Sequence, residues 1–229
     1  MSIFSLFEGI DRCAPGDAAS LTRACAGLAP TARVLDAGCG RGADLPALLA
    51  LVPEGQVTAI DLAEPFIASI RARFPTVLAN VADMTDPPGG PYDLIWSGGA
   101  IYGPRIGAAF SAWRARLAPR GRVVFTDLVL RGREVSPEVA GFFSAEGIAS
   151  RDVAGLKAEV AAMGWRCVDG FWLPDSAWDA YYLPLEQRLD ALADDSELAE
   201  FVAGFRREIA VWRHHGTEYG YYLIVAVPE

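Results

Sequence analysis

Residues 34–45, which read VLDAGCGRGADL, constrain the fold of this chain more than any other segment. An apolar run that ends in Asp36 leads directly into a turn where Gly38, Gly40 and Gly42 alternate with other residues. Glycine adopts backbone angles that other residues avoid, and it lets a ligand approach the backbone closely. The segment therefore predicts a strand whose carboxyl end opens into a ligand-binding turn.

Apolar segments rich in strand-forming residues alternate with segments of helical periodicity over the first 130 residues. Such alternation is typical of a parallel sheet covered by helices, so we expect an α/β, Rossmann-like fold. The expected strands are 32–37, 56–62, 76–81, 92–97 and 121–128. The expected helices are 18–28, which Asp17 caps, 47–52, 64–74 and 108–117.

The pattern changes after residue 130. A helix is expected at 150–165, a sixth strand at 166–173, two helices within 174–217 and a terminal strand at 218–227. We therefore expect one domain with four parts: an N-terminal helical cap (1–31), a cofactor-binding core (32–173), a helical insert (174–217) and a terminal strand (218–229). Because a parallel sixth strand delivers the insert to the carboxyl edge of the sheet, we interpret the insert as a substrate lid. The alternative is a helical buttress for the sheet.

The composition excludes several classes of partner. A formal net charge of −9 disfavours nucleic acid, whose phosphates are bound by clustered Lys and Arg. No apolar run is long enough to cross a membrane, and the first residues lack the pattern of a signal peptide. The four cysteines form no paired spacing, which indicates reduced thiols. We expect a cytoplasmic monomer or homodimer without a membrane partner.

The glycine turn alone does not identify its ligand, because Gly38-x-Gly40-x-x-Ala43 also satisfies the loose dinucleotide fingerprint. Asp61, at the end of the second strand, suits the ribose hydroxyls of either a dinucleotide or S-adenosylmethionine. Asp36 would repel a pyrophosphate but attract the sulfonium and ammonium of S-adenosylmethionine. The alternatives are an NAD(P)-dependent oxidoreductase and a non-catalytic S-adenosylmethionine-binding regulator.

Asp83 and Met84 follow the third strand, a pairing suited to an adenine ring. With these residues the segment 32–128 resembles the class I S-adenosylmethionine-dependent methyltransferases. The resemblance implies a seven-stranded sheet of order 3-2-1-4-5-7-6 with strand 7 antiparallel, and methyl transfer from S-adenosyl-L-methionine to a small-molecule acceptor. The expected cofactor-binding residues are Arg12, Asp36, Gly38, Cys39, Gly40, Asp61, Leu62, Asp83, Met84, Trp96, Ser97 and Gly98.

A closer likeness covers segments 93–103, 171–184 and 218–227, which are similar to bacterial methyltransferases of ubiquinone/menaquinone-biosynthesis type. In that group a Glu precedes the Gly-Ala-Ile-Tyr stretch, where this chain has Gly98. A role of that Glu in substrate binding therefore does not transfer to this chain.

Methyl transfer mainly requires positioning, and a base is needed only when the nucleophile arrives protonated. Tyr102 is a candidate for positioning or deprotonating the acceptor, although its ring could equally pack under a helix. His214 is the other candidate base, weighed against an exposed position at a helix end.

Aromatic residues near the carboxyl end of the chain could form a cage for an apolar or cationic substrate, or could pack in the core. The candidates for substrate contact are Tyr102, Trp178, Tyr181, Tyr182 and Tyr219, with Trp172, Tyr221 and Tyr222 also considered. Asp127 ends the fifth strand without a second acid at a useful spacing, so we expect no metal site.

Overall fold

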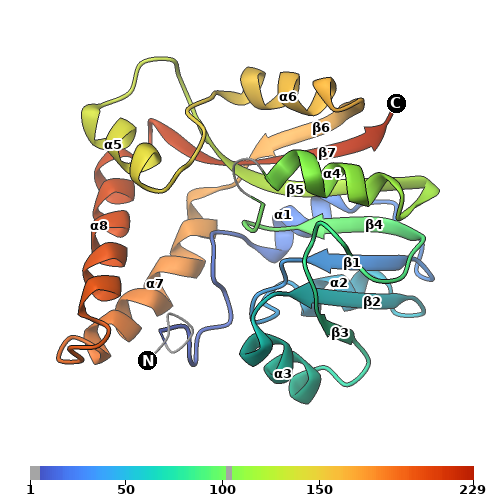
Figure 1. Ribbon diagram of the computed structural model, residues 1–229, viewed down its shortest axis with the longest axis horizontal. Coiled ribbons are helices and arrows are strands. Elements are labelled where there is room, and N and C mark those ends of the chain that lie inside the picture. The colour runs from blue at the N-terminus through green and yellow to red at the C-terminus, as the bar shows by residue number, and fades with distance from the viewer. Residues whose placement is uncertain (1–5, 102–104) are drawn as a thin grey trace.

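Seven strands form one sheet in the order β3-β2-β1-β4-β5-β7-β6 in this computed structural model, which describes residues 6–101 and 105–229 (Figure 1). The strands are β1 (Arg33–Ala37), β2 (Gln56–Asp61), β3 (Leu78–Val81), β4 (Tyr92–Ser97), β5 (Leu117–Leu130), β6 (Trp165–Trp172) and β7 (Tyr219–Pro228). The first five pair in parallel, and β7 is antiparallel to both β5 and β6. The expected strand order and direction are confirmed.

The helices are α1 (Ala18–Ala24), α2 (Leu45–Leu51), α3 (Glu64–Arg73), α4 (Arg105–Arg114), α5 (Pro137–Ala145), α6 (Val153–Ala162), α7 (Asp175–Ala191) and α8 (Ala199–His215). The Asp17 carboxylate caps α1 by accepting from Ser20 N at 2.7 Å, as expected. Several boundaries differ from the expectation. For example, α1 ends at Ala24 and α4 ends at Arg114, and β5 extends at both ends because it pairs with β4 at Leu117 and with β7 at Leu130.

The sheet is buried on both faces. One hydrophobic core joins it to α1, α2 and α3 and continues into α5, α7 and α8, whereas a second core joins it to α4 and α6. Side chains of β7 alternate between the two cores, so that Tyr219 and Tyr221 belong to the first and Tyr222 belongs to the second. The two-sided burial explains why this strand reads as a continuous apolar run.

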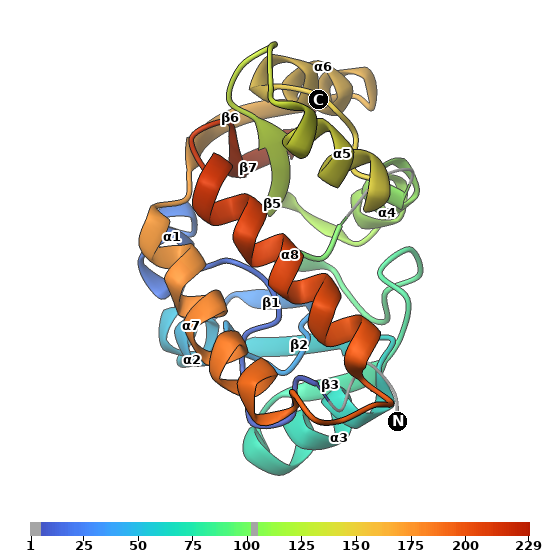
Figure 2. The same cartoon turned by 90° about the vertical axis from the view of Figure 1, so that its left-hand side faces the viewer.

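The insert forms the two expected helices, α7 and α8, and residues 192–198 connect them. They lie side by side beyond the carboxyl ends of the parallel strands (Figures 1 and 2). Six side chains of α7 are buried, so this helix is part of the first core. Among residues 6–101 and 105–229, no helix combines the length and apolarity that crossing a membrane requires.

Helix α5 was not expected from the sequence. Its start carries recognisable signals, since the Ser136 hydroxyl accepts a hydrogen bond from Val139 N and Pro137 occupies the first turn. The short length of nine residues made its periodicity weak.

Candidate active site

A cavity of about 150 Å³ opens at the carboxyl ends of β1, β2 and β4, and we call it the glycine-turn cavity. Its lining comes from the glycine turn, from the strand tips and from the segment ahead of α1. The lining residues are Asp11, Arg12, Cys13, Ala14, Asp36, Gly38, Cys39, Gly40, Arg41, Ala43, Asp44, Asp61, Phe66, Gly98, Gly99 and Ala100. Seven of the twelve expected cofactor residues are in this set.

The glycine turn is fixed by backbone hydrogen bonds and by close packing. The amides of Gly38 and Cys39 both donate to Ile60 O at 2.9 Å, which ties the turn to β2. A Cβ on Gly38 would lie 2.4 Å from the Cβ of Ala100, and its φ of +79° disfavours other residues. Gly38 therefore allows the loop after β4 to approach the turn.

Asp61 is held in one orientation by two backbone amides. Its Oδ2 accepts from Gly40 N and its Oδ1 accepts from Ala63 N, both at 2.9 Å. Each carboxylate oxygen retains capacity for another donor, such as a ribose hydroxyl. The acid expected to bind ribose thus lines the cavity with acceptors available.

Asp36 is only 2 % exposed, and its buried Oδ2 has no hydrogen-bond partner among the described residues. Burial, together with the charges of Asp44 and Asp61, raises the pKa of Asp36 well above its usual value. A buried carboxylate without a partner favours a cationic or donating ligand and disfavours a pyrophosphate. The site therefore fits S-adenosylmethionine, which carries a sulfonium and an ammonium group.

Asp44 joins two of the expected cofactor residues. Arg12 Nη2 donates to Asp44 Oδ1 at 2.6 Å, and Trp96 Nε1 donates to Asp44 Oδ2 at 2.9 Å. A Cβ on Gly98 would lie 3.0 Å from Asp44 Oδ2 and 3.1 Å from Trp96 Nε1. Sequence reasoning missed Asp44, although it closes the glycine turn and directly precedes α2.

The other expected cofactor residues are not in the lining of this cavity. Ser97 is fully buried and donates to Ala37 O at 2.9 Å, which indicates a role within the sheet. Leu62 follows β2 and is 59 % exposed. Asp83 Oδ1 accepts from the amide and hydroxyl of Thr85, and the Met84 side chain lies close to Gly38.

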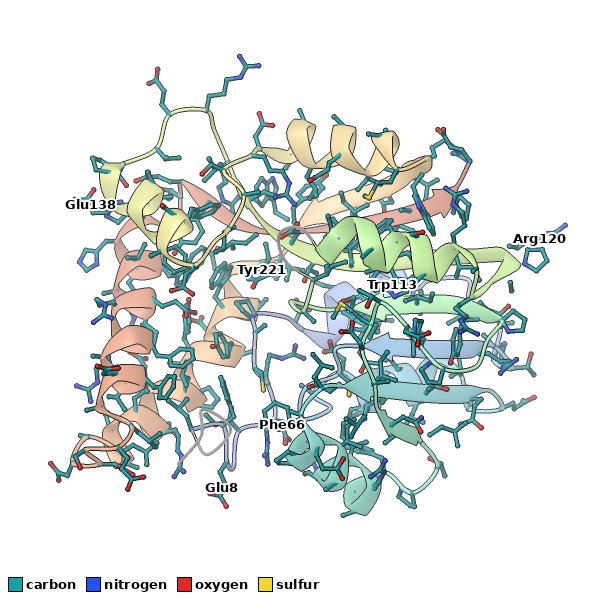
Figure 3. All side chains as sticks on the ribbon, in the orientation of Figure 1. Glu8, Phe66, Trp113, Arg120, Glu138 and Tyr221 are labelled. Atoms are coloured by element: carbon teal, nitrogen blue, oxygen red, sulfur yellow. The ribbon has the colours of Figure 1, made fainter. Side chains whose placement is uncertain are left out.

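A second cavity, of about 260 Å³, lies among the insert helices, β7 and α5, and we call it the insert cavity. It is lined by Phe7, Cys13, Ala14, Pro15, Leu128, Phe142, Glu146, Ile148, Trp178, Tyr181, Tyr182, Phe205, Glu208 and Tyr221. Cys13 and Ala14 also line the glycine-turn cavity, so the two cavities adjoin. Figure 3 labels one residue of each cavity, Phe66 and Tyr221, and both lie toward the end of the sheet that is nearer to α7 and α8.

The aromatic candidates divide between this cavity and the core. Trp178, Tyr181 and Tyr182 line the cavity, and Trp178 also stacks on Trp212 with ring centroids 3.6 Å apart. Tyr219 is fully buried outside the lining and packs edge-on against Phe143, so its expected contact with substrate is not supported.

Trp172 and Tyr222 pack against each other in the second core, on the opposite face of the sheet from Tyr221. Tyr102 lies outside the described residues.

Glu208, on α8, was not anticipated from the sequence. Tyr182 Oη donates to Glu208 Oε1 at 3.0 Å. Burial raises the pKa of Glu208 to about 7, and the charge of Glu146 adds to this while the Tyr182 hydrogen bond opposes it. No Lys, Arg or His of the described residues pairs with this carboxylate.

The two histidines lie at the end of α8. His214 is exposed, with Nδ1 2.8 Å from Ala210 O, and it lines neither cavity. His215 Nδ1 lies 2.7 Å from Glu218 Oε1 and 3.2 Å from Ser136 Oγ, which joins α8 to the start of α5. The expected base role of His214 therefore has no support from its position.

Asp127, which was considered as a metal ligand, forms an ion pair with Arg151 at 2.5 Å. Burial raises the pKa of Asp127 to about 6, against the opposing effect of Arg151. The pair holds the segment before α6 against β5.

Comparisons with known proteins agree with this geometry. Residues 34–121 match a family model described as a methyltransferase domain. A search of curated protein sequences gives no match to this chain.

Solved structures share the whole fold. An S-adenosylmethionine-dependent methyltransferase from Thiobacillus denitrificans in complex with S-adenosyl-L-homocysteine has a TM-score of 0.78 at 22% identity, over 100% of this chain and 99% of that one. The corresponding complex from Geobacter sulfurreducens has a TM-score of 0.79 at 20% identity, over 99% and 98% of the two chains. A Haemonchus contortus phosphoethanolamine N-methyltransferase, in complex with phosphomonomethylethanolamine and S-adenosylhomocysteine, has a TM-score of 0.75 at 17% identity, over 99% and 57%.

Residues 34–121 thus match a methyltransferase-domain model, and the chain has the fold of the class I S-adenosylmethionine-dependent methyltransferases. The expected resemblance to this class is confirmed by the family-model match and the shared fold, and the Thiobacillus denitrificans and Geobacter sulfurreducens structures contain S-adenosyl-L-homocysteine. The likeness to the ubiquinone/menaquinone-biosynthesis type stays a prediction.

Proposed function

We propose that this protein transfers the methyl group of S-adenosylmethionine to a small-molecule acceptor bound in the insert cavity. The observation that carries the proposal is the shared lining of the two cavities, since Cys13 and Ala14 belong to both. A donor in the glycine-turn cavity and an acceptor in the insert cavity would therefore meet at this boundary.

Three charged residues are assigned to the donor. Asp61 accepts from the ribose hydroxyls. Asp36, whose Oδ2 has no partner within residues 6–101 and 105–229, accepts from the ammonium group. Arg12 keeps N–H groups beyond the one that holds Asp44, so it can donate to the donor carboxylate. When bound, S-adenosylmethionine supplies a methyl group on a positively charged sulfur for in-line displacement.

The remaining contribution of the chain is to position the acceptor and to exclude water. The insert, residues 174–217, supplies five lining residues of the insert cavity: Trp178, Tyr181, Tyr182, Phe205 and Glu208. Its two helices stand over the carboxyl edge of the sheet (Figure 2). This arrangement supports the role of a substrate lid.

The size of the insert cavity supports a small acceptor. A volume of about 260 Å³ suits a molecule of metabolite size rather than a polymer. The Haemonchus contortus structure, whose fold is similar, holds phosphomonomethylethanolamine, which is such a molecule.

Calorimetry and a turnover screen test the proposal together. We expect binding of S-adenosylmethionine and S-adenosylhomocysteine and no comparable binding of NAD. We also expect S-adenosylhomocysteine to accumulate when the protein is incubated with S-adenosylmethionine and a metabolite library. Tighter binding of NAD would indicate an oxidoreductase, whereas donor binding without turnover of any library member would indicate a regulator; either result contradicts the proposal.

A further inference from the structure

The insert cavity combines an aromatic lining with carboxylates. Trp178, Tyr181, Tyr182 and Tyr221 line it, and the faces of such rings attract cations. Glu146 and Glu208 also line it, whereas none of the described lining residues is a Lys, Arg or His. The cavity is therefore suited to a positively charged ligand and unsuited to an anion.

Glu208 is a partly buried carboxylate of this cavity that has no cationic partner among the described residues. It is partly buried, and its hydrogen-bond partner among the described residues is the neutral Tyr182 hydroxyl. A carboxylate removed from water without a counter-ion costs free energy, and a ligand cation would offset that cost. The hydrogen bond from Tyr182 fixes one carboxylate oxygen and leaves acceptor capacity on the other.

The groups that face Glu208 from neighbouring elements do not supply a counter-charge. Among the described residues they are Tyr182 of α7, Tyr219 of β7 and Glu146 after α5. The two tyrosines are neutral phenols at physiological pH, because burial raises the pKa of Tyr182 and Tyr219 above the usual value. Glu146 is itself an acid, so it increases the need for a cation.

We propose that the acceptor bound in the insert cavity carries a cationic amine, with the Glu208 carboxylate as its counter-ion and the surrounding aromatic rings as its cage. The inference rests on the proposed function, which makes the occupant of this cavity the methyl acceptor. It assigns Glu208 a role in binding, and Tyr182 the role of a positioning residue that orients the carboxylate.

Three probes of similar shape and different charge test whether the insert cavity prefers a cationic amine. We would titrate 2-phenylethylamine, 2-phenylethanol and phenylacetate into the full-length protein saturated with S-adenosylhomocysteine and measure affinity by calorimetry. The amine should bind on the order of tenfold more tightly than the alcohol, and phenylacetate should bind most weakly. Equal or tighter binding of the alcohol or of phenylacetate would overturn the inference, as would absence of amine binding at about 10 mM.

Variants assign the preference to one side chain. Glu208→Gln keeps the acceptor for the Tyr182 hydroxyl and removes the charge, so it should lower amine affinity on the order of tenfold and leave alcohol affinity unchanged. Glu200→Gln, at an exposed acid on the same helix, is the matched control and should change neither affinity. Unchanged amine affinity in Glu208→Gln would overturn the assignment.

The pH dependence gives a second readout that a purely structural role would not produce. Amine affinity should rise between about pH 6 and about pH 8, because Glu208 becomes charged there while an alkylammonium stays protonated. The rise should be absent in Glu208→Gln. A flat profile in the unmodified protein would contradict the inference.

A measurement of donor binding distinguishes failure of the proposed function from failure of the assigned acceptor class. Failure of S-adenosylhomocysteine to bind the unmodified protein would contradict the proposed function itself. Normal donor binding without a preference for the amine would contradict only the assignment of the acceptor class.

Discussion

The indole Nε1 of Trp96 donates a hydrogen bond to Asp44 Oδ2 at 2.9 Å, and this contact connects the tip of β4 to the residue that closes the glycine turn. Arg12 holds the other oxygen of Asp44, so a segment ahead of α1 joins the same network. Gly98 lies directly against it, because a Cβ there would approach both Asp44 and Trp96. The absence of a side chain at Gly98 therefore leaves room for the hydrogen bond between Trp96 and Asp44.

We predict that Gly98→Glu lowers affinity for S-adenosylhomocysteine on the order of tenfold. The new side chain would displace the Trp96–Asp44 hydrogen bond and place a second negative charge beside Asp44. Calorimetry measures the change, with Gly141→Glu as control because Gly141 is exposed and has open space around it. Unchanged affinity in Gly98→Glu would show that the network is not needed for donor binding.

We predict that Asp61→Ala weakens binding of S-adenosylmethionine by on the order of 1.5–3 kcal/mol, as expected for the loss of charge-assisted hydrogen bonds. The carboxylate also orients Gly40 N, so its removal loosens the turn as well. Asp86→Ala is the control, since that side chain is 90% exposed and is not in the lining of the glycine-turn cavity. Wild-type affinity in Asp61→Ala would remove this residue from the donor site.

The strand order was expected only from the resemblance to the class I methyltransferases. The acids at the strand tips were predictable because parallel strands bring their carboxyl ends to one edge. Asp36 and Asp61 follow from this rule alone, since each lies at or next to the end of a strand that the apolar pattern identifies. The two helices of the insert were equally predictable from their periodicity. Local pattern and topology were sufficient in these cases.

The insert cavity was less predictable because its composition depends on packing between distant segments. Glu208 acquires its environment from Tyr182, which lies 26 positions away on another helix. Dependence on packing between distant segments also explains the different positions of Tyr219 and Tyr221. The two tyrosines are two residues apart on one face of the strand, yet only Tyr221 lines the insert cavity. No local signal distinguishes these two tyrosines.

We predict that Glu208→Gln stabilises the free protein at neutral and mildly alkaline pH. The pKa of Glu208 is about 7 in the folded protein against 4.5 in the ordinary group, so the folded state binds the extra proton. Stability should therefore fall as pH rises from 4.5 to about 7, and the full penalty should remain above that range. The variant lacks this penalty.

Denaturant midpoints between about pH 5 and about pH 8 measure the difference between the two proteins. Asp127 titrates with the same sign and a folded pKa of about 6, so only the difference curve isolates Glu208. Glu200→Gln should follow the unmodified protein throughout. A constant difference between Glu208→Gln and the unmodified protein across this range would contradict the assigned pKa.

Finally, we predict that replacing residues 174–217 by a short Gly-Ser linker unfolds the protein. Helix α7 buries Ala177, Trp178, Tyr181, Tyr182, Leu185 and Leu189 in the first core. Truncating a single buried aromatic side chain typically costs about 3–5 kcal/mol, and a whole domain has only about 5–15 kcal/mol of stability. Circular dichroism and thermal unfolding measure the outcome, and the control replaces only the connection at 193–196 with Gly and Ser. A cooperatively folded protein without the insert would show that α7 and α8 are a detachable cover, whereas loss of the cooperative transition means that the proposed lid is also part of the core.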